Sequence, residues 1–260
     1  MNRIAFEIVG HPIYWYGIMF ALGIFAALWT CCRRTRVPVP PGFTPISADQ
    51  FLNAAPWIII GAILGARALF VITYWDQYFS GRPLLEIFNL FNGGLVYFGG
   101  LIGAILMLII YLIKNHILSW SFFDLIAPSL ALGHAFGRIG CFINGCCYGH
   151  PTECFLGFSY PKWHETFGTP VHPVQLYESA SNLLLFGILE YAFRHRKYEG
   201  QTAALYLIAY GVLRTIMELF RGDVGKVFLI FSQAQCIALL ITLIGFGILI
   251  WLKIKKSSSR

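Results

Sequence analysis

The chain's 260 residues are 57% hydrophobic and only 12% charged, and the mean hydropathy is +0.67. Soluble domains carry about 25% charged residues, so this composition excludes that class. Apolar runs long enough to cross about 30 Å of hydrocarbon recur along the chain, and they predict an all-α polytopic membrane protein. The net charge of +7 does not indicate a nucleic-acid partner, because the basic residues flank apolar runs, as the positive-inside rule describes.

About seven transmembrane helices are predicted, in a single domain of residues 1–260. Their approximate bounds are Tyr14–Cys32, Phe51–Tyr74, Gly93–Ile113, Asp124–Phe136, Val174–Phe193, Ala203–Phe220 and Val227–Leu252. The fourth is short for a membrane span. The first apolar run has no basic region before it and no small-residue cleavage site after it, so we expect it to be retained as a helix.

The basic residues of the loops predict the orientation. On one side lie Arg33, Arg34, Arg36, Lys114, Arg194, Arg196, Lys197, Lys253, Lys255, Lys256 and Arg260. On the other lie Arg3, Arg82, Lys162, Arg221 and Lys226. The richer side is expected in the cytoplasm, which places the N-terminus out, the C-terminus in, and the region of residues 137–172 outside.

Small residues recur four positions apart inside the predicted spans. The pairs are Gly61/Gly65, Gly99/Gly103 and Gly133/Gly137. Such spacing lets two helices approach closely in a membrane, so we interpret these glycines as packing residues.

The most unusual stretch runs from Gly137 to Gly149 and contains an arginine, an asparagine, three cysteines and four glycines. Two more arginines, Arg67 and Arg214, fall inside apolar runs. An arginine in a membrane costs several kcal/mol and should face a polar cavity. Arg214 and Glu218 are four residues apart, which alone suggests an ordinary helical ion pair. Together with Arg138, however, these arginines indicate an anion inside the bundle, such as a phospholipid headgroup.

Two further motifs each allow two interpretations. His172, Gln175 and Glu178 recur every three residues at the start of the fifth span, so they roughly share one face. A histidine with a carboxylate could work as general base or acid, or His172 could only cap the helix. Tyr14-Trp15-Tyr16 is typical of an interfacial aromatic belt.

The cysteines leave several alternatives open. The cysteines at 141, 146, 147 and 154 could ligate zinc, but the adjacent pair and the lack of any C-x-x-C spacing argue against it. A disulfide on the oxidising side and a nucleophilic thiol near Arg138 are other interpretations. We favour small, polarizable packing residues.

Taken together, these motifs resemble the bacterial prolipoprotein diacylglyceryl transferases. The matching blocks are Trp15-Tyr16-Gly17, Gly65-Ala66-Arg67, Gly99-Gly100-Leu101-Ile102-Gly103, Asp124-Leu125-Ile126-Ala127-Pro128, Gly137 to Gly149, His172 to Glu178 and Arg214 to Arg221. They occur in family order over nearly the whole chain.

The resemblance implies a multi-pass enzyme of the bacterial cytoplasmic (inner) membrane. It would transfer the diacylglyceryl group of phosphatidylglycerol to the lipobox cysteine thiol in the signal peptide of a prolipoprotein. A thioether would form and glycerol 1-phosphate would leave, as the first step of lipoprotein maturation. No metal and no diffusible cofactor is implied, and the bilayer is the remaining partner.

The resemblance also implies residue roles. Arg138 and Arg214 would hold the phosphate, Glu218 would orient Arg214, and Tyr16 would complete the catalytic group. Substrate contacts would come from Arg138 together with Asn144, Gly149, Arg221, Arg67, His172, Gln175, Tyr177 and Glu178.

The chain departs from the family pattern at three polar positions. Phe98 stands where the family has a histidine proposed as base, Cys141 replaces an asparagine, and Cys146 replaces a glutamate. Tyr97, His172 and Glu178 are then the candidate bases, or the arginine field alone favours the thiolate. A non-catalytic phospholipid-binding or transport protein and a zinc membrane hydrolase are the rival classes.

Overall fold

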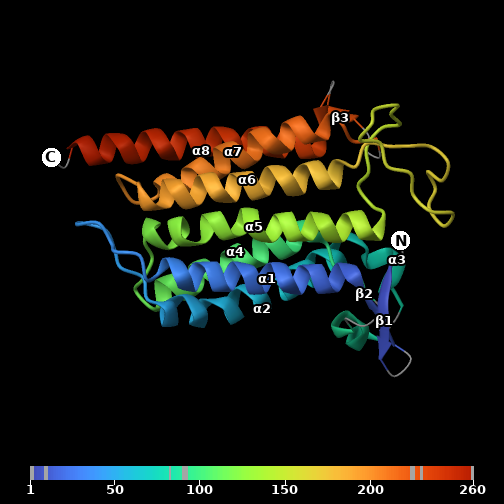
Figure 1. Ribbon diagram of the computed structural model, residues 1–260. Coiled ribbons are helices and arrows are strands. Elements are labelled where there is room, and N and C mark those ends of the chain that lie inside the picture. Colours follow the sequence, from blue (N-terminus) through green and yellow to red (C-terminus); the bar gives the residue numbers. More distant parts are fainter. Residues whose placement is uncertain are drawn as a thin grey trace. The chain divides into compact units, whose positions relative to one another are not determined.

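The computed structural model describes residues 3–8, 11–81, 83–89, 93–222, 226–228 and 231–258, and they are mainly helical (Figure 1). Two compact units are formed, one by Met1–Pro45 with Phe123–Arg260 and the other by Ile46–Phe122. The prediction of a single domain stays a prediction.

The first unit begins with a β-hairpin and is otherwise built from long helices. Its elements are β1 (Ile4–Ile8), β2 (His11–Tyr14), α1 (Trp15–Arg34), α5 (Trp120–Asn144, from Phe123), α6 (Val174–Arg194), α7 (Gln201–Glu218), β3 (Lys226–Phe228), β4 (Phe231–Ser232) and α8 (Gln233–Ser258). In Figure 1 the helices α6, α7 and α8 run side by side, in yellow, orange and red.

The second unit is a helix pair with a short connecting segment. Its elements are α2 (Ala48–Thr73), α3 (Trp75–Tyr78), the 3₁₀ helix η1 (Leu84–Phe88) and α4 (Tyr97–Lys114). α2 starts at a capping box, because Ser47 and Gln50 each accept a hydrogen bond from the other's backbone N–H.

Glycines bring α2 and α4 together, as the spacing predicts. A Cβ atom on Gly61 would overlap the carbonyl oxygen of Gly103, and one on Gly65 would overlap that of Gly99. The third predicted pair is only half right. Gly133 lies against Gly23 of α1, whereas a Cβ on Gly137 would meet no atom within 4 Å.

We therefore expect Gly103→Ala to destabilise the protein by about 1–3 kcal/mol, the usual cost of overpacking. The added methyl group meets backbone of α2 that cannot rotate away. Gly247→Ala in α8 is the matched control, because a Cβ there meets nothing within 4 Å. Thermal unfolding of both variants in detergent measures the difference, and equal midpoints would contradict the close contact.

Among the described residues, five helices are long and apolar enough to cross a membrane: α1, α2, α4, α5 and α8, the last over Gln233–Ser257. The other two predicted spans exist as α6 and α7, with 21 and 18 residues. They carry Glu178 and Glu190 on α6, and Arg214 and Glu218 on α7. These charged side chains lower the mean hydropathy of α6 and α7.

The predicted bounds of the fourth span were wrong. In place of Asp124–Phe136, α5 runs over 25 residues to Asn144 and includes Pro128 and half of the glycine-rich stretch. Glycine and proline are more frequent in membrane helices than in soluble ones, so they do not end the helix here. Arg138 consequently lies on a regular helix rather than in a loop.

Two contacts fix the register of the helices around α5. Asp124 accepts hydrogen bonds from the backbone N–H groups of Gly200 (2.7 Å) and Ala203 (2.9 Å), so it caps the N-terminus of α7. Buried Ala131 of α5 packs with Leu185 and Leu189 of α6 in the apolar core. These contacts set the heights at which polar residues of α5, α6 and α7 face one another.

Candidate functional site

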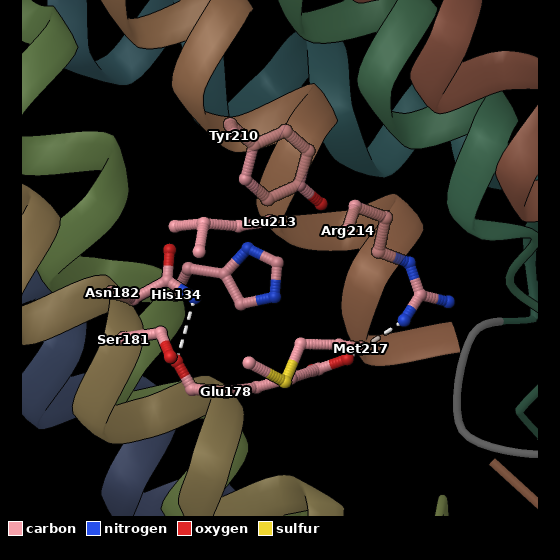
Figure 2. A pocket seen from close by; sticks show the side chains of 8 residues that line it. All are labelled: His134, Glu178, Ser181, Asn182, Tyr210, Leu213, Arg214 and Met217. Atoms are coloured by element: carbon pink, nitrogen blue, oxygen red, sulfur yellow. Dashed lines mark hydrogen bonds and ion pairs between the residues drawn. The ribbon is translucent and has the colours of Figure 1, made fainter. Parts of the chain in front are cut away.

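A chain of ion pairs joins α5, α6 and α7. Glu178 of α6 pairs with Arg138 of α5 through one oxygen and with Arg214 of α7 through the other, the latter at 2.7 Å. Arg214 also contacts Glu218 at 2.9 Å through its second terminal nitrogen. Figure 2 shows Arg214 directed toward Glu178. The i,i+4 pair predicted from the sequence is confirmed, and Glu178 connects it to Arg138.

The network ends at the C-terminal end of α7. Glu218 lies 3.8 Å from Arg221 and accepts a hydrogen bond of 2.7 Å from the hydroxyl of Ser232. Both glutamate side chains are at most 4% exposed, and the three arginines are 13–14% exposed. Three guanidinium groups and two carboxylates leave a net charge of +1. We call these five residues the arginine cluster: Arg138, Glu178, Arg214, Glu218 and Arg221.

His134 adjoins the cluster and was not singled out from the sequence. Its Nε2 accepts a hydrogen bond of 3.0 Å from Nε of Arg138, and its ring lies 5.3 Å from that of Tyr210. Figure 2 shows the imidazole pointing into a small cavity of about 10 Å³ beside Glu178 and Arg214. Its position four residues before Arg138, on the same helix face, was the available signal.

The arginine cluster has the properties of an anion site. Guanidinium groups bind phosphate and carboxylate oxygens bidentately. The two glutamates hold the guanidinium groups in fixed orientations, and three guanidinium groups gathered in one place favour an anionic ligand. Their low exposure strengthens this attraction, because the local dielectric is lower than that of water.

The three cysteines of the central stretch converge just beyond the arginines. Helix α5 ends in a Schellman motif, in which the N–H groups of Gly145 and Cys146 bond to the carbonyls of Phe142 (3.2 Å) and Cys141 (3.2 Å). The sulfurs of Cys141, Cys146 and Cys147 all lie within 4.8 Å of one another. The turn therefore brings together sulfur atoms whose spacing in the sequence argued against a metal site. Cys154 is exposed and is not part of this group.

Buried polar side chains hold the cysteine turn in place. Gln175 donates to the carbonyl of Cys146 (2.6 Å) and to the hydroxyl of Tyr160 (2.9 Å). His164 bonds through Nε2 to the carbonyl of Gly145 (2.6 Å) and stacks on Tyr160 with ring centroids 4.0 Å apart. Burial raises the pKa of Tyr160 to about 12, so its hydroxyl stays protonated at neutral pH.

Gln175→Leu should lower stability by about 1–3 kcal/mol, because the carbonyl of Cys146 and the hydroxyl of Tyr160 lose a donor while buried. Tyr160→Phe removes only the second of these bonds and is the matched control. The reaction of the turn's thiols with a maleimide should accelerate in Gln175→Leu but not in Tyr160→Phe. Identical labelling rates in both variants would show that Gln175 does not hold the turn.

Tyr16 of α1 and Asn144 of α5 lie together, although they come from different helices. Both line an open groove of about 460 Å³ that is bordered also by Pro12, Ile13 and Tyr14 of the hairpin. Asn144 is the last residue of α5, and the thiol of Cys146 just beyond it donates to the carbonyl of Cys141 at 3.7 Å. Tyr16 is 44% exposed, and its ring lies against Gly140 of α5, where an added Cβ would come within 3.1 Å of it. The groove therefore borders the C-terminal part of α5, which carries Arg138 and Cys141.

Gly149 and His172 join two segments that flank the cluster. The N–H of Gly149 bonds to the carbonyl of His172 at 2.9 Å, and Gly149 forms a β-bridge with Arg221. A Cβ on Gly149 would lie 2.6 Å from the carbonyl oxygen of Phe220. His172 bonds through Nδ1 to the hydroxyl of Tyr177 at 3.2 Å. His172 and Tyr177 therefore contact each other, while Glu178 faces the arginines.

Arg67 belongs to the second unit and contacts backbone there. Its guanidinium group donates to the carbonyls of Glu86 (2.8 Å), Ile87 (2.6 Å), Gly93 (2.9 Å) and Gly94 (3.2 Å). These bonds satisfy the N–H donors of an arginine that the sequence suggested as part of an anion site. The proposed lipid contact of Arg67 stays a prediction.

The other two positions of interest in the second unit are Tyr97 and Phe98 at the start of α4. Tyr97 is 71% exposed and Phe98 40%. Their rings lie edge to face with centroids 5.6 Å apart. The phenyl ring of Phe98 cannot accept a proton, and the suggestion of Tyr97 as base is untested.

Comparison with known proteins places these features in a family. Residues 3–251 match the profile of the family described as prolipoprotein diacylglyceryl transferase. The chain is 36% identical to the phosphatidylglycerol–prolipoprotein diacylglyceryl transferase of Finegoldia magna, over 98% of this chain and 97% of the relative. It is 36% identical to that of Clostridium tetani (94% and 95% covered) and 32% identical to that of Salmonella choleraesuis (96% and 92%). The resemblance inferred from the motifs is thus confirmed, and the chain belongs to the prolipoprotein diacylglyceryl transferase family.

Proposed function

We propose that this protein transfers the diacylglyceryl group of phosphatidylglycerol to the lipobox cysteine of prolipoproteins in the bacterial cytoplasmic membrane. The cysteine sulfur attacks the glycerol carbon that carries the phosphate ester. The carbon–oxygen bond breaks, a carbon–sulfur bond forms, and the electron pair leaves on the oxygen of glycerol 1-phosphate. The thiol loses its proton before or during the attack.

This proposal is carried by the arginine cluster, in which three guanidinium groups meet at the ends of α5 and α7. A phosphodiester bears one negative charge, and the phosphate monoester that leaves bears up to two. Guanidinium groups bind the first charge and stabilise the second as it develops. Fixed donors aimed at developing charge commonly make the greatest single contribution to catalysis.

Within the cluster the glutamates orient the arginines. Both oxygens of Glu178 are paired with guanidinium groups, so we assign this carboxylate an orienting role in place of the base that the sequence suggested. His172, another suggested base, contacts the hydroxyl of Tyr177. Arg138 and Arg214 bind the phosphate, and Glu218 and Arg221 support Arg214. Tyr16 and Asn144 border the groove by which we propose that substrate enters.

The proposed topology has seven spans, with the N-terminus out and the C-terminus in. It is supported by the eleven basic residues on one side against five on the other. In right-side-out vesicles, a membrane-impermeant maleimide should label exposed Cys154, judged by the signal lost in Cys154→Ser. A cysteine introduced by Ser257→Cys should react only after permeabilisation. The reverse pattern would contradict the orientation.

The function is tested by reconstitution. The purified full chain in phosphatidylglycerol vesicles should form a thioether on a reporter prolipoprotein, seen as a mass increase of one diacylglyceryl group. Phosphatidylethanolamine vesicles and a reporter without its lipobox cysteine are the controls. The same chain should restore lipidation in a bacterium depleted of its own transferase.

The alternative is a phospholipid-binding protein without transfer activity. Saturable binding of phosphatidylglycerol without any thioether product, in protein that is folded and inserted, would favour that alternative and reject the enzyme. Absence of both binding and transfer would reject the anion site itself.

A further inference from the structure

The sulfur atoms of Cys141, Cys146 and Cys147 form a cluster that the arginine chemistry does not use. All three side chains are partly buried free thiols, and their sulfurs lie within 4.8 Å of one another. We call them the thiol triad. Three ligands of one kind, from a helix end and the turn that follows it, are the donor set of a metal site.

The backbone holds the triad in an unfavourable conformation. Gly145 has φ +79° and Cys147 has φ +64°. A residue other than glycine in this left-handed region costs roughly 1–3 kcal/mol and persists only where its surroundings impose it. The bonds from His164 and Gln175 to the two carbonyls before Cys147 impose it here. The turn is thus preorganised to direct Cys146 and Cys147 back toward Cys141.

The dimensions of the triad suit zinc. Sulfur ligands lie about 2.3 Å from Zn²⁺ in tetrahedral sites, which places them about 3.8 Å apart. The sulfur atoms are separated by up to 4.8 Å. Shifts of about 1 Å or less, which small χ1 rotations provide, would bring them to the separation in a zinc site. Soft thiolates select Zn²⁺ or Cu⁺ over Mg²⁺ and Ca²⁺.

The charges around the triad also fit. Three thiolates and Zn²⁺ carry a net charge of −1. Arg138 lies about one turn before Cys141 on α5, and Arg221 forms a β-bridge with Gly149, two residues after Cys147. A disulfide between two of the cysteines would leave the third thiol without a role. A metal uses all three.

We propose that Cys141, Cys146 and Cys147 bind one Zn²⁺ whose open fourth position takes the substrate thiol as a thiolate. This deepens the transfer reaction proposed above and rests on it for the identity of that thiol. Metal coordination deprotonates a thiol, and the proton passes to water. The sulfur then attacks the glycerol carbon and the phosphate ester leaves, while zinc stays Zn²⁺ throughout.

Phe98 stands at the position of the family's proposed base and cannot accept a proton. Zinc bound by the triad would activate the substrate thiol in its place, and two of the triad residues, Cys141 and Cys146, are themselves departures from the family pattern. Tyr16 and Asn144 line the substrate groove. Asn144 is also the last residue of α5, between Cys141 and Cys146 in the turn that forms the triad. The open coordination position is therefore reached from the groove.

The first test measures metal and not activity. The full chain, purified in detergent from zinc-supplemented cells and passed over a chelating resin, should retain about one zinc per chain. In Cys146→Ser the zinc affinity should fall more than about 100-fold, beyond the loss that a changed outer-shell partner causes. Cys154→Ser, on the exposed neighbouring segment, is the matched control and should keep its zinc. Cobalt loaded into the unaltered chain should give thiolate charge-transfer absorption, which needs no variant.

The second test separates this inference from the proposed function. Stripping zinc with a strong chelator should abolish thioether formation while phosphatidylglycerol binding persists, and added zinc should restore transfer. Transfer by metal-free protein would overturn the inference and leave the transferase intact. The inference would also be overturned if Cys146→Ser and the parent chain bound equal amounts of zinc. Stoichiometric copper in place of zinc, or an intact mass that shows a disulfide within the triad, would have the same consequence. Zinc bound at the triad without transfer would reject the transferase and retain the metal site.

Discussion

Glu178→Gln lowers the rate of diacylglyceryl transfer by about 100- to 1,000-fold, the scale expected when charge-stabilising groups lose their positions. The carboxylate holds Arg138 with one oxygen and Arg214 with the other. Glutamine keeps the shape but carries no charge and offers only one acceptor oxygen. The two guanidinium groups then repel each other without an intervening anion, and their orientation toward the phosphate is lost. Steady-state kinetics with reporter prolipoprotein in phosphatidylglycerol vesicles measures the effect.

The control for this variant lies on the same helix. Glu190 pairs with buried Arg34 at 2.5 Å, away from the arginine cluster. Glu190→Gln therefore breaks one partly buried ion pair and destabilises the fold without reaching the site. Thermal unfolding of both variants separates stability from activity. If Glu190→Gln lost as much transfer as Glu178→Gln at equal folded fractions, the special position of Glu178 would be disproved.

Arg214→Lys is the second variant with a large expected effect, a loss of roughly 100-fold in kcat with a smaller change in KM. Arg214 contacts Glu178 and Glu218 through different terminal nitrogens. Lysine keeps the charge but has a single nitrogen and no planar fork, so it cannot bridge both carboxylates and a phosphate. A loss concentrated in kcat indicates contacts that strengthen as the leaving group gains charge.

Arg221→Lys provides a graded comparison. Arg221 lies 3.8 Å from Glu218, beyond good hydrogen-bond distance, so exchange for lysine should cost about 10-fold or less. Its contacts with the rest of the chain remain available to a positive side chain. A larger loss for Arg221→Lys than for Arg214→Lys would mean that Arg221, rather than Arg214, grips the phosphate.

The sequence determined the class, the family and most of the helices by itself. Composition and long apolar runs demand a membrane environment whatever the packing, because backbone polar groups in lipid must be satisfied within helices. The i,i+4 relation of Arg214 and Glu218 is likewise a local property of one helix, and the structure confirms that pair. The glycine spacing likewise predicted that these helices pack closely against a neighbour, whereas the structure decided that α2 meets α4.

The end of α5 was misplaced because glycine and proline signal breaks in soluble helices but not reliably in membrane ones. The glycine-rich stretch looked like a loop, yet its first half is helical up to Asn144. Residue propensity is a weak prior that packing overrides. Here Gly23 on α1 packs closely against Phe136 on α5, and this contact stabilises the continued helix.

Only the tertiary structure decided how the polar residues divide into sites. Glu178 lies 36 positions before Arg214, and no local period reveals that it joins Arg214 to Arg138. The approach of three cysteine sulfurs depends on two left-handed residues and on bonds from His164 and Gln175. Such contacts depend on the heights at which α5, α6 and α7 pack, which Asp124 and the apolar core set. Local pattern fixes which residues share one helix, whereas the meeting of residues from different helices is a property of the packed bundle.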